Sequence, residues 1–255
     1  MKLVAFDTST EACSVAVQID GEVRNDHRLV QREHAALLLS MVQGLLEEFA
    51  IKPKELDGVI FGQGPGSFTG VRIAAAAAQG LAVAANCGVQ GVSSLQAMAS
   101  ACVRECHDRL DGTEWVVAAL DARMDQIYAN CYQAQKAVQA LGDEVVVNAD
   151  DFNLPRTHDD TASELNPTTV GSERLVRKLL LCGSGAERYQ SELAQRCNAL
   201  GEFDLNFVSS VYPNALDLLR LAESGEPTQW LLAHEAQPVY LRNKVALTEA
   251  ERLSS

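Results

Sequence analysis

The first thirty residues of the chain follow a strand-like hydrophobic pattern. Residues 2–7 form a short apolar run that ends in a polar turn. Residues 12–19 alternate between two sets of side chains, which is the period-two pattern of a strand. The dipeptide Asp20-Gly21 then favours a tight turn into a further strand over residues 22–30. The pattern therefore predicts three consecutive strands joined by short turns.

Beyond residue 30 the hydrophobic period changes. Leucine, methionine, valine and phenylalanine repeat every three or four positions over residues 34–49, and Pro53 closes this segment, so a helix is predicted. A strand at 57–61 leads into a glycine-rich loop, and an alanine-rich helix then runs to about Ala85.

A second strand–helix pair follows. Residues 88–92 form a short strand, and Ser93 is placed to cap a helix that runs towards His107. The predicted order is thus β-β-β-α-β-α-β-α. Three meandering strands followed by alternating units are typical of a mixed sheet with helices on its faces.

The second half of the chain carries a weaker version of the same pattern. Strands are predicted at 114–120 and 126–133, separated by a turn at 121–125, and another strand at 144–148. A β-hairpin that restarts near residue 114 suggests a second lobe built on a similar, reduced plan.

The remaining segments are a loop, a glycine turn and a late helix. Residues 148–169 are rich in Asp, Asn, Thr and Pro and predict a loop or insertion. The apolar run 179–182 leads into Gly183-Ser184-Gly185 and a helix, and residues 213–224 form an amphipathic helix. We divide the α/β chain into lobes at 1–110 and 111–255, with the late helix free to pack back on the first lobe.

Length and composition are those of an ordinary globular protein. The chain has 255 residues, of which 47% are hydrophobic and 22% charged. Arg72, Gln79 and Gly80 interrupt its longest apolar run, which falls short of the roughly 20 residues of a membrane span. The N-terminus predicts a strand and no signal peptide. Seven cysteines without paired spacing indicate reduced thiols and a cytoplasmic protein.

The net charge is −13, and most of it lies in the second half of the chain. Residues 1–110 carry 9 basic and 12 acidic side chains, and residues 111–255 carry 12 and 22. Nucleic-acid binding draws much of its affinity from Lys and Arg that neutralise phosphates. Without a basic stripe, a role on RNA or DNA would require another subunit to hold the nucleic acid.

The glycine-rich segment 62–72 is the most informative motif. A strand, a glycine loop and a helix N-terminus in succession can bring backbone N–H groups towards an anion or another chain. The segment has no lysine, so the phosphate loop of nucleotide hydrolases is absent, and Ser67 interrupts the dinucleotide pattern. Ser67 and Thr69 fit helix caps better than nucleophiles.

Other polar clusters have two readings each. Asp7, Thr8, Ser9 and Thr10 end the first strand, where they could hold a phosphate or hydrated magnesium, or satisfy backbone groups of a tight turn. The charged turn at 121–125 fits a solvated hairpin. The histidines lack a partner three or four residues away, and Cys102-x-x-x-Cys106 lacks a second ligand pair, so we predict no metal site.

The two long N-terminal helices leave a further alternative open. The helix at 34–49 has a wide apolar stripe, and the alanine helix has small residues that permit close approach of another helix. If both faced solvent, the apolar patch would exceed what a monomer normally exposes. Either each helix covers one face of the sheet, or parts of both form a subunit interface.

With these residues in view, the chain resembles the TsaB (YeaZ) family over nearly its whole length. These proteins support threonylcarbamoylation of adenosine 37 in tRNA. The glycine segment together with the Asp-Ala-Arg turn is highly specific. The resemblance rests on the segments 7–16, 32–34, 62–73, 79–82, 120–124 and 238–243.

The resemblance implies an actin/Hsp70/sugar-kinase-like fold, with two ribonuclease-H-like lobes of which the second is reduced. It also implies two partners, the related catalytic subunit TsaD and the ATPase TsaE, with a homodimer when TsaD is absent and only indirect contact with tRNA. TsaD-type sequences carry His-x-x-x-His where Ser94 and Met98 stand here, and neither side chain can replace imidazole as a metal ligand.

The resemblance therefore implies a non-catalytic scaffold with no catalytic residue and no tightly bound cofactor of its own, ATP or ADP entering only within the complex. The expected partner-binding residues are His34, Leu38, Met41, Val42, Leu45, Arg72, Ile73, Ala76 and Leu81. The alternative is an ATP-binding enzyme of the sugar-kinase-like class that grips the nucleotide with Asp7, Thr8, Ser9 and Thr10 and the 183–185 turn. A peptidase is the least favoured hypothesis.

Overall fold

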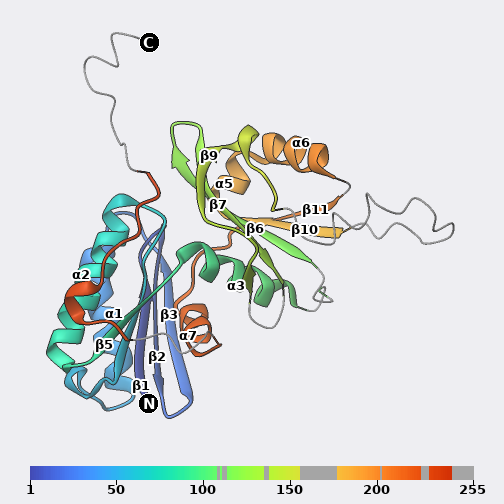
Figure 1. Ribbon diagram of the computed structural model, residues 1–255. Coiled ribbons are helices and arrows are strands. Elements are labelled where there is room, and N and C mark those ends of the chain that lie inside the picture. The colour runs from blue at the N-terminus through green and yellow to red at the C-terminus, as the bar shows by residue number, and fades with distance from the viewer. Residues whose placement is uncertain are drawn as a thin grey trace, which may run out of the picture.

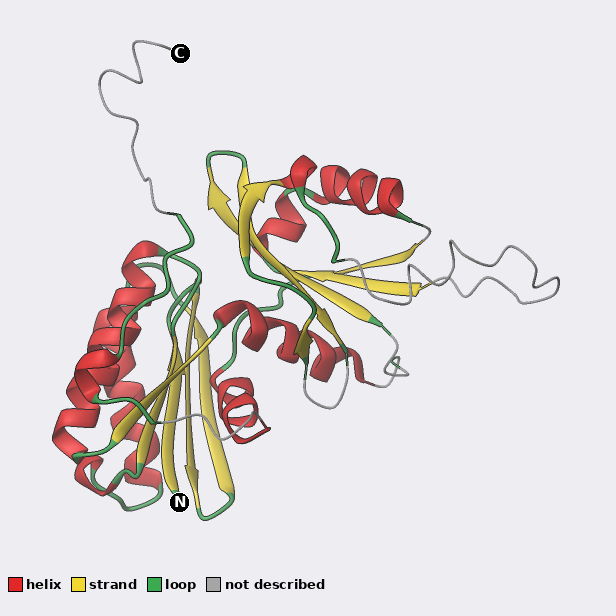
Figure 2. Cartoon of the chain, viewed as in Figure 1, coloured by secondary structure: helices red, strands yellow, loops and turns green. Residues whose placement is uncertain are grey.

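The computed structural model describes residues 1–107, 110, 114–134, 138–155, 177–201, 203–224 and 230–242. These residues form two β-sheets, each with helices packed on it, as the ribbon in Figure 1 and the secondary-structure view in Figure 2 show. The segments predicted as strands in the first 92 residues all form strands, and the helices begin and end within a few residues of their predicted bounds.

The first sheet has the strand order β3-β2-β1-β4-β5. Its strands β1, β2 and β3 form an antiparallel meander, and β4 and β5 add to β1 in parallel. The bounds are β1 Lys2–Asp7, β2 Ala12–Ile19, β3 Glu22–Leu29, β4 Gly58–Gly62 and β5 Gly88–Val92.

The second sheet repeats this order. It reads β11-β10-β6-β7-β8, with β9 also paired to β7, so an antiparallel hairpin is again extended by two parallel strands. The bounds are β6 Trp115–Arg123, β7 Gln126–Gln133, β8 Gln139–Ala140, β9 Val145–Asn148, β10 Arg177–Cys182 and β11 Phe203–Val208. The shared topology confirms the two-lobed, ribonuclease-H-like fold.

Helices cover both faces of the first sheet, though in a different way from the sequence expectation. Both α1 and α2 pack on one face, and α3 and α7 pack on the other. Two further helices, α5 and α6, pack on the second sheet. The bounds are α1 His34–Glu48, α2 Phe68–Ala85, α3 Ser94–Cys106, α5 Ser184–Arg188, α6 Gln190–Leu200 and α7 Ala215–Ser224, with single 3-10 turns at Pro53–Glu55, Ala149–Asp151 and Ala233–Glu235.

The apolar stripe of α1 belongs to the protein's own core, which corrects one expectation. We expected it to face a partner protein, yet its side chains pack on the first sheet against β1, β2 and β4 and are at most 6% exposed. A period of 3.6 residues identifies the buried side of a helix, but it does not show whether the protein's own sheet or a partner protein buries that side. The residues concerned are Leu38, Met41, Val42 and Leu45.

One helix, α2, is long and apolar enough to cross a membrane by length and composition alone. Its inner face packs on the first sheet through small residues such as Ala74, Ala78 and Ala82. This packing is that of a helix at the edge of a protein core.

The C-terminal part of the chain returns to the first lobe. The N–H of Ala215, at the start of α7, donates to Ser14 Oγ of β2 at 2.9 Å. Farther on, Leu231 forms a short antiparallel bridge with Val89, and the Trp230 ring lies against Gly58. Residues 215–224 and 230–236 thus pack with the first sheet, a course that the sequence division had left open for the late helix.

The sequence did not predict α6, β8 or β11, which complete the second lobe. Of the loop expected at 148–169, Asn148 closes β9 and Ala149–Asp151 forms a 3-10 turn; residues 156–169 lie outside the described part of the chain.

Candidate functional site

The glycine loop between β4 and α2 is fixed to the ends of two strands. The backbone N–H of Ser67 donates to the carbonyl of Ser9 at 2.7 Å, and the N–H of Ser94 donates to the carbonyl of Gly64 at 2.8 Å. Ser67 also caps α2, because its Oγ accepts from the N–H of Gly70 at 3.4 Å. The loop is therefore held on one side by the 7–10 turn and on the other by the start of α3.

A buried carboxylate lies at the centre of this arrangement. Asp7 is 1% exposed, and its Oδ1 accepts from the N–H and the Oγ of Ser9 at 2.7 and 2.6 Å. Its Oδ2 accepts from Ser94 Oγ at 2.6 Å, which links β1 to α3. Both oxygens are thus engaged by the protein itself, as a buried polar group requires.

The pKa of the Asp7 carboxyl is raised above its ordinary value. Burial is the main cause, since it disfavours the charged form, while the hydrogen bonds from Ser9 and Ser94 and the nearby His34 act in the opposite direction. The carboxyl group of Asp7 thus serves as a structural hydrogen-bonding group, in a buried environment that disfavours its charged form.

The two threonines of the turn also bond inwards. Thr8 Oγ1 donates to the carbonyl of Gly70 at 2.7 Å, and Thr10 Oγ1 accepts from the N–H of Ala12 at 3.2 Å. The four residues expected to grip a nucleotide, Asp7, Thr8, Ser9 and Thr10, instead hold the turn and the glycine loop together. Of the two readings left open by the sequence, this geometry favours the structural one.

The glycines of the loop are explained by close backbone contact. A Cβ on Gly70 would lie 1.9 Å from the carbonyl oxygen of Thr8, and a Cβ on Gly66 would lie 2.5 Å from that of Ser9. The 7–9 backbone thus fills the space beside the loop where an anion would otherwise approach the helix N-terminus.

The positions of the expected catalytic histidines face the junction of the two lobes. Ser94 is bound to Asp7, and Met98, one helical turn later, is fully buried. The Met98 thioether lies against Gly183 of the second glycine turn, where a Cβ would be 2.5 Å from Met98 Cε. The described residues contain no group of three or more His, Cys, Asp or Glu side chains arranged to hold a metal ion.

The Asp-Ala-Arg turn meets the C-terminal segment. Asp121 accepts hydrogen bonds from Arg123 and from Arg188 Nη1 at 3.1 Å. Arg242 reaches across to the same hairpin, where it donates to the carbonyl of Arg123 at 3.5 Å and to Gln126 Oε1. Two segments that are far apart in the sequence and that carry the family resemblance are therefore in contact; Asn243 lies outside the described residues.

The outward side of α1 and α2 is the second candidate site. Of the residues expected to bind a partner, Arg72 and Ala76 are exposed, and His34, Ile73 and Leu81 are half-buried. The sequence interpretation missed three large apolar side chains on this side, Leu39, Phe68 and Val83, which are 54%, 60% and 72% exposed. The sequence feature that could have identified them is an apolar residue at a helix position outside the period of the buried stripe. We call Leu39, Phe68, Arg72, Ala76, Gly80 and Val83 the outer helix face.

An aromatic pair orders one end of the outer helix face. The Arg72 guanidinium lies 3.2 Å from the centroid of the Phe68 ring and 5.0 Å from that of Tyr240. A planar cation between two rings is held in a defined orientation while remaining accessible.

Comparison with known proteins gives a consistent result. A family model described as TsaD, tRNA N6-adenosine threonylcarbamoyltransferase, matches residues 26–245. Two proteins named tRNA threonylcarbamoyladenosine biosynthesis protein TsaB are similar over 96% of this chain. The one from Haemophilus influenzae is 34% identical over 95% of its length, and the one from Escherichia coli is 33% identical over 96%.

A solved structure from Pseudomonas aeruginosa, described as a protein with similarity to peptidase YEAZ, has the same fold. It is 35% identical, with a TM-score of 0.75, and the match covers 94% of this chain and 99% of that one.

The close contact at Gly70 predicts that replacing it by alanine affects stability differently from the same replacement at Gly80, another glycine of α2. Gly70→Ala should lower the free energy of unfolding by about 1–3 kcal/mol, because its Cβ would overlap the Thr8 carbonyl. Gly80→Ala is the matched control: its Cβ meets nothing within 4 Å, so it should raise stability by about 1 kcal/mol. Urea denaturation measures both; equal effects would contradict this account of the loop.

The buried carboxylate predicts a pH effect on stability. An unfolded Asp ionises near pH 3.9, whereas folded Asp7 keeps its proton to higher pH. The folded state binds more protons between these two values, so the Asp7 contribution to stability falls as pH rises through that window. Asp7→Asn should remove this slope, which denaturation at a series of pH values from 4 to 8 would detect. Parallel curves for the variant and the wild type would argue against it.

Proposed function

The chain belongs to the TsaB (YeaZ) family, and we propose that it is a non-catalytic subunit of the machinery that transfers threonylcarbamoyl to N6 of adenosine 37 in tRNA. The modified tRNAs are those that read codons beginning with adenine. In this reaction the chain acts as a scaffold and activator, through a complex with TsaD and TsaE. The observation that carries the proposal is the environment of Ser94 and Met98: one is bound to Asp7 and the other is packed on Gly183.

The chemistry of these two positions supports a non-catalytic role. A hydroxyl already donating to a carboxylate and a buried thioether offer no imidazole for a metal ion. The reaction then depends on a partner that carries the missing histidines. A peptidase function, suggested by the wording used for the Pseudomonas relative, has no support from the described residues, since Ser67 serves as a helix cap.

The outer helix face is the surface we assign to the partner. It combines exposed large apolar residues with Ala76 and Gly80, whose small size lets another helix approach closely. Burial of exposed apolar groups next to an oriented arginine is typical of interface hot spots. TsaD would bind here, and a second copy would take its place when TsaD is absent. Within this interface Leu38, Met41, Val42 and Leu45 act indirectly, by holding α1 on the sheet.

The charge of the chain supports an indirect role towards tRNA. At −13, with the acidic excess mainly in the second half, it would repel a phosphate backbone unless basic partners bind the nucleic acid. ATP or ADP would likewise be held together with partner proteins, since the 7–10 turn uses its side chains internally. A cytoplasmic location is part of the same proposal.

A charge placed in the outer helix face should block assembly. Ala76→Glu would bury an unpaired carboxylate against TsaD, and we expect its affinity for TsaD to fall at least about 100-fold. Size-exclusion chromatography with light scattering measures complex formation, and a reconstituted tRNA modification assay with TsaD and TsaE should lose activity to the level seen without this chain.

The matched control is Ala199→Glu, which puts the same charge on an exposed helical alanine of the second lobe. Both variants should keep the wild-type circular dichroism spectrum. Full assembly and full modification with Ala76→Glu would exclude this face, and full modification with the chain left out would exclude the scaffold role itself.

The isolated chain should not bind ATP tightly. Calorimetric titration with ATP and magnesium is expected to give no stoichiometric binding at micromolar concentration, because the candidate phosphate ligands already hold the glycine loop. Tight binding accompanied by turnover would instead favour the ATP-binding enzyme and reject the scaffold.

A further inference from the structure

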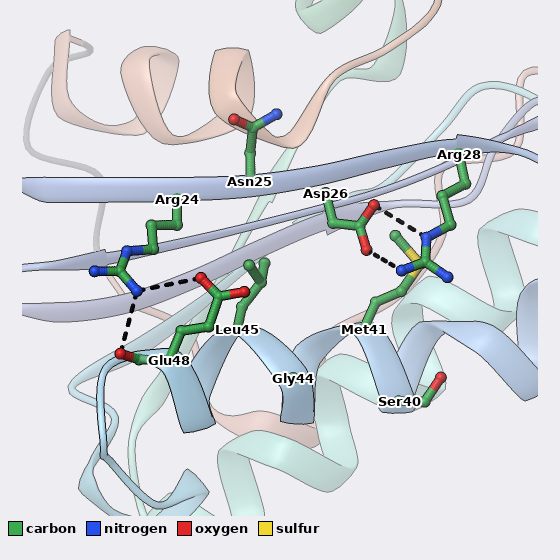
Figure 3. Close-up of a pocket in the computed structure, with 9 residues that line it drawn as sticks. All are labelled: Arg24, Asn25, Asp26, Arg28, Ser40, Met41, Gly44, Leu45 and Glu48. Carbon is green, nitrogen blue, oxygen red and sulfur yellow. Dashed lines mark hydrogen bonds and ion pairs between the residues drawn. The ribbon is translucent and has the colours of Figure 1, made fainter.

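Strand β3 forms one edge of the first sheet and offers an unoccupied row of backbone groups. Its inner side pairs with β2 over eight residues, and within the described part of the chain its outer side pairs with no strand. Figure 3 looks onto this edge, with α1 on one side of the strand. Helix α7 packs near β3 from the other side of the sheet. A long exposed edge of this kind is a template for pairing with another chain.

The register with β2 shows which residues have free backbone groups. The N–H of Val30 donates to the carbonyl of Glu11, so even-numbered residues of β3 point their N–H and C=O groups towards β2. The odd-numbered residues therefore point theirs outwards. They are Val23, Asn25, His27 and Leu29.

The even-numbered residues of β3 alternate in charge. Their side chains lie on the α1 side of the sheet, as Figure 3 shows for Arg24, Asp26 and Arg28. The order is Glu22, Arg24, Asp26, Arg28. Many exposed edges carry charged side chains, above all Lys, that oppose pairing, whereas a series of alternating sign can complement its own reverse.

We propose that β3 pairs antiparallel with β3 of a second copy of this chain, in the register that places Asn25 opposite Asn25. In that register the outward backbone groups of both strands meet, with Val23 opposite His27. Arg24 then faces Asp26 of the second copy, and Glu22 faces Arg28. The two five-stranded sheets become one continuous sheet across a twofold axis.

Charge selects this register over its neighbours. A shift of two residues in one direction would put Arg24 opposite Arg24, and a shift in the other would put Asp26 opposite Asp26. Like charges directly opposite each other destabilise a strand pair. In the proposed register the four charged contacts lie at non-hydrogen-bonded positions, where facing side chains are closest.

A groove lies beside β3 on the side of α1. An open cavity of about 470 Å³ lies between β3 and α1, and its α1 wall includes Ser40 and Gly44. A Cβ added to Gly44 would meet nothing within 4 Å. Gly44 lies beneath the middle of β3 in Figure 3, where the twofold axis would bring the two α1 helices together.

This surface is separate from the outer helix face, so the inference does not rest on the proposed function. None of the residues that define the outer helix face lines the groove. Two copies joined through β3 would leave both outer helix faces free for a catalytic partner.

Disulfide trapping tests the register. In an Ala76→Glu background, which blocks the outer helix face, Asn25→Cys places two thiols at opposed positions about 5.5 Å apart between Cα atoms, within disulfide reach. Val23→Cys is the matched control on the same strand and face, because its twin lies four positions away, about 13 Å along the strand. Diamide oxidation at micromolar protein should cross-link Asn25→Cys at least tenfold more than Val23→Cys or the parent with its seven native thiols.

Charge reversal tests the energetic basis by sedimentation equilibrium in the same background. Arg24→Glu should weaken self-association about tenfold, since two contacts per dimer become repulsive. Adding Asp26→Arg should restore it, because the two charges are then exchanged. A parent that stays monomeric, equal cross-linking of the two cysteine variants, or a dimer indifferent to Arg24→Glu would each overturn the proposal.

Discussion

The buried carboxylate of Asp7 is the interaction on which the arrangement of the first lobe depends. It joins the end of β1, the turn that follows it and the first residue of α3, and this same turn holds the glycine loop through the Ser9 carbonyl. A buried carboxyl without partners would be costly, so the three hydrogen bonds are a condition of the fold. Polar residues that could serve a nucleotide in another protein serve as a structural anchor in this one.

The hydrogen bonds of Asp7 also determine the contact between the two lobes. Because Ser94 is tied to Asp7, α3 has a fixed orientation, and its next turn brings Met98 onto Gly183. The glycine has a φ of +94°, and its lack of a side chain leaves space for the thioether. A position that would carry a metal ligand in a catalytic relative has become part of the contact between two sheets.

The sequence predicted the succession of strands and helices along the first lobe, because its periods of two and 3.6 residues are strong, but it did not predict the order of the strands within the sheet. It did not show which surface packs against the apolar stripe of α1. In the structure Leu38 and Leu45 pack on the protein's own sheet, while Leu39 and Val83 are exposed to solvent. Period alone does not distinguish these cases. In the second lobe β11 and α6 were missed. Helix α6 buries only Leu193 and Cys197, which gives little contrast between its faces. Strand β11 does alternate apolar and polar side chains, and the sequence interpretation overlooked this period-two signal. The hydrogen bond between Asp7 and Ser94 joins residues 87 positions apart, which local patterns do not encode.

The route of the chain has a mechanical consequence. The polypeptide leaves the first sheet after α3, builds the second sheet and comes back as α7, whose first N–H is tied to Ser14. Any swivelling of one half against the other must therefore flex two connections at once, and Arg242 adds a third tether at the hairpin. A rotation of one sheet relative to the other would also break the hydrogen bond between Arg242 and Gln126 and would separate the Met98 thioether from Gly183.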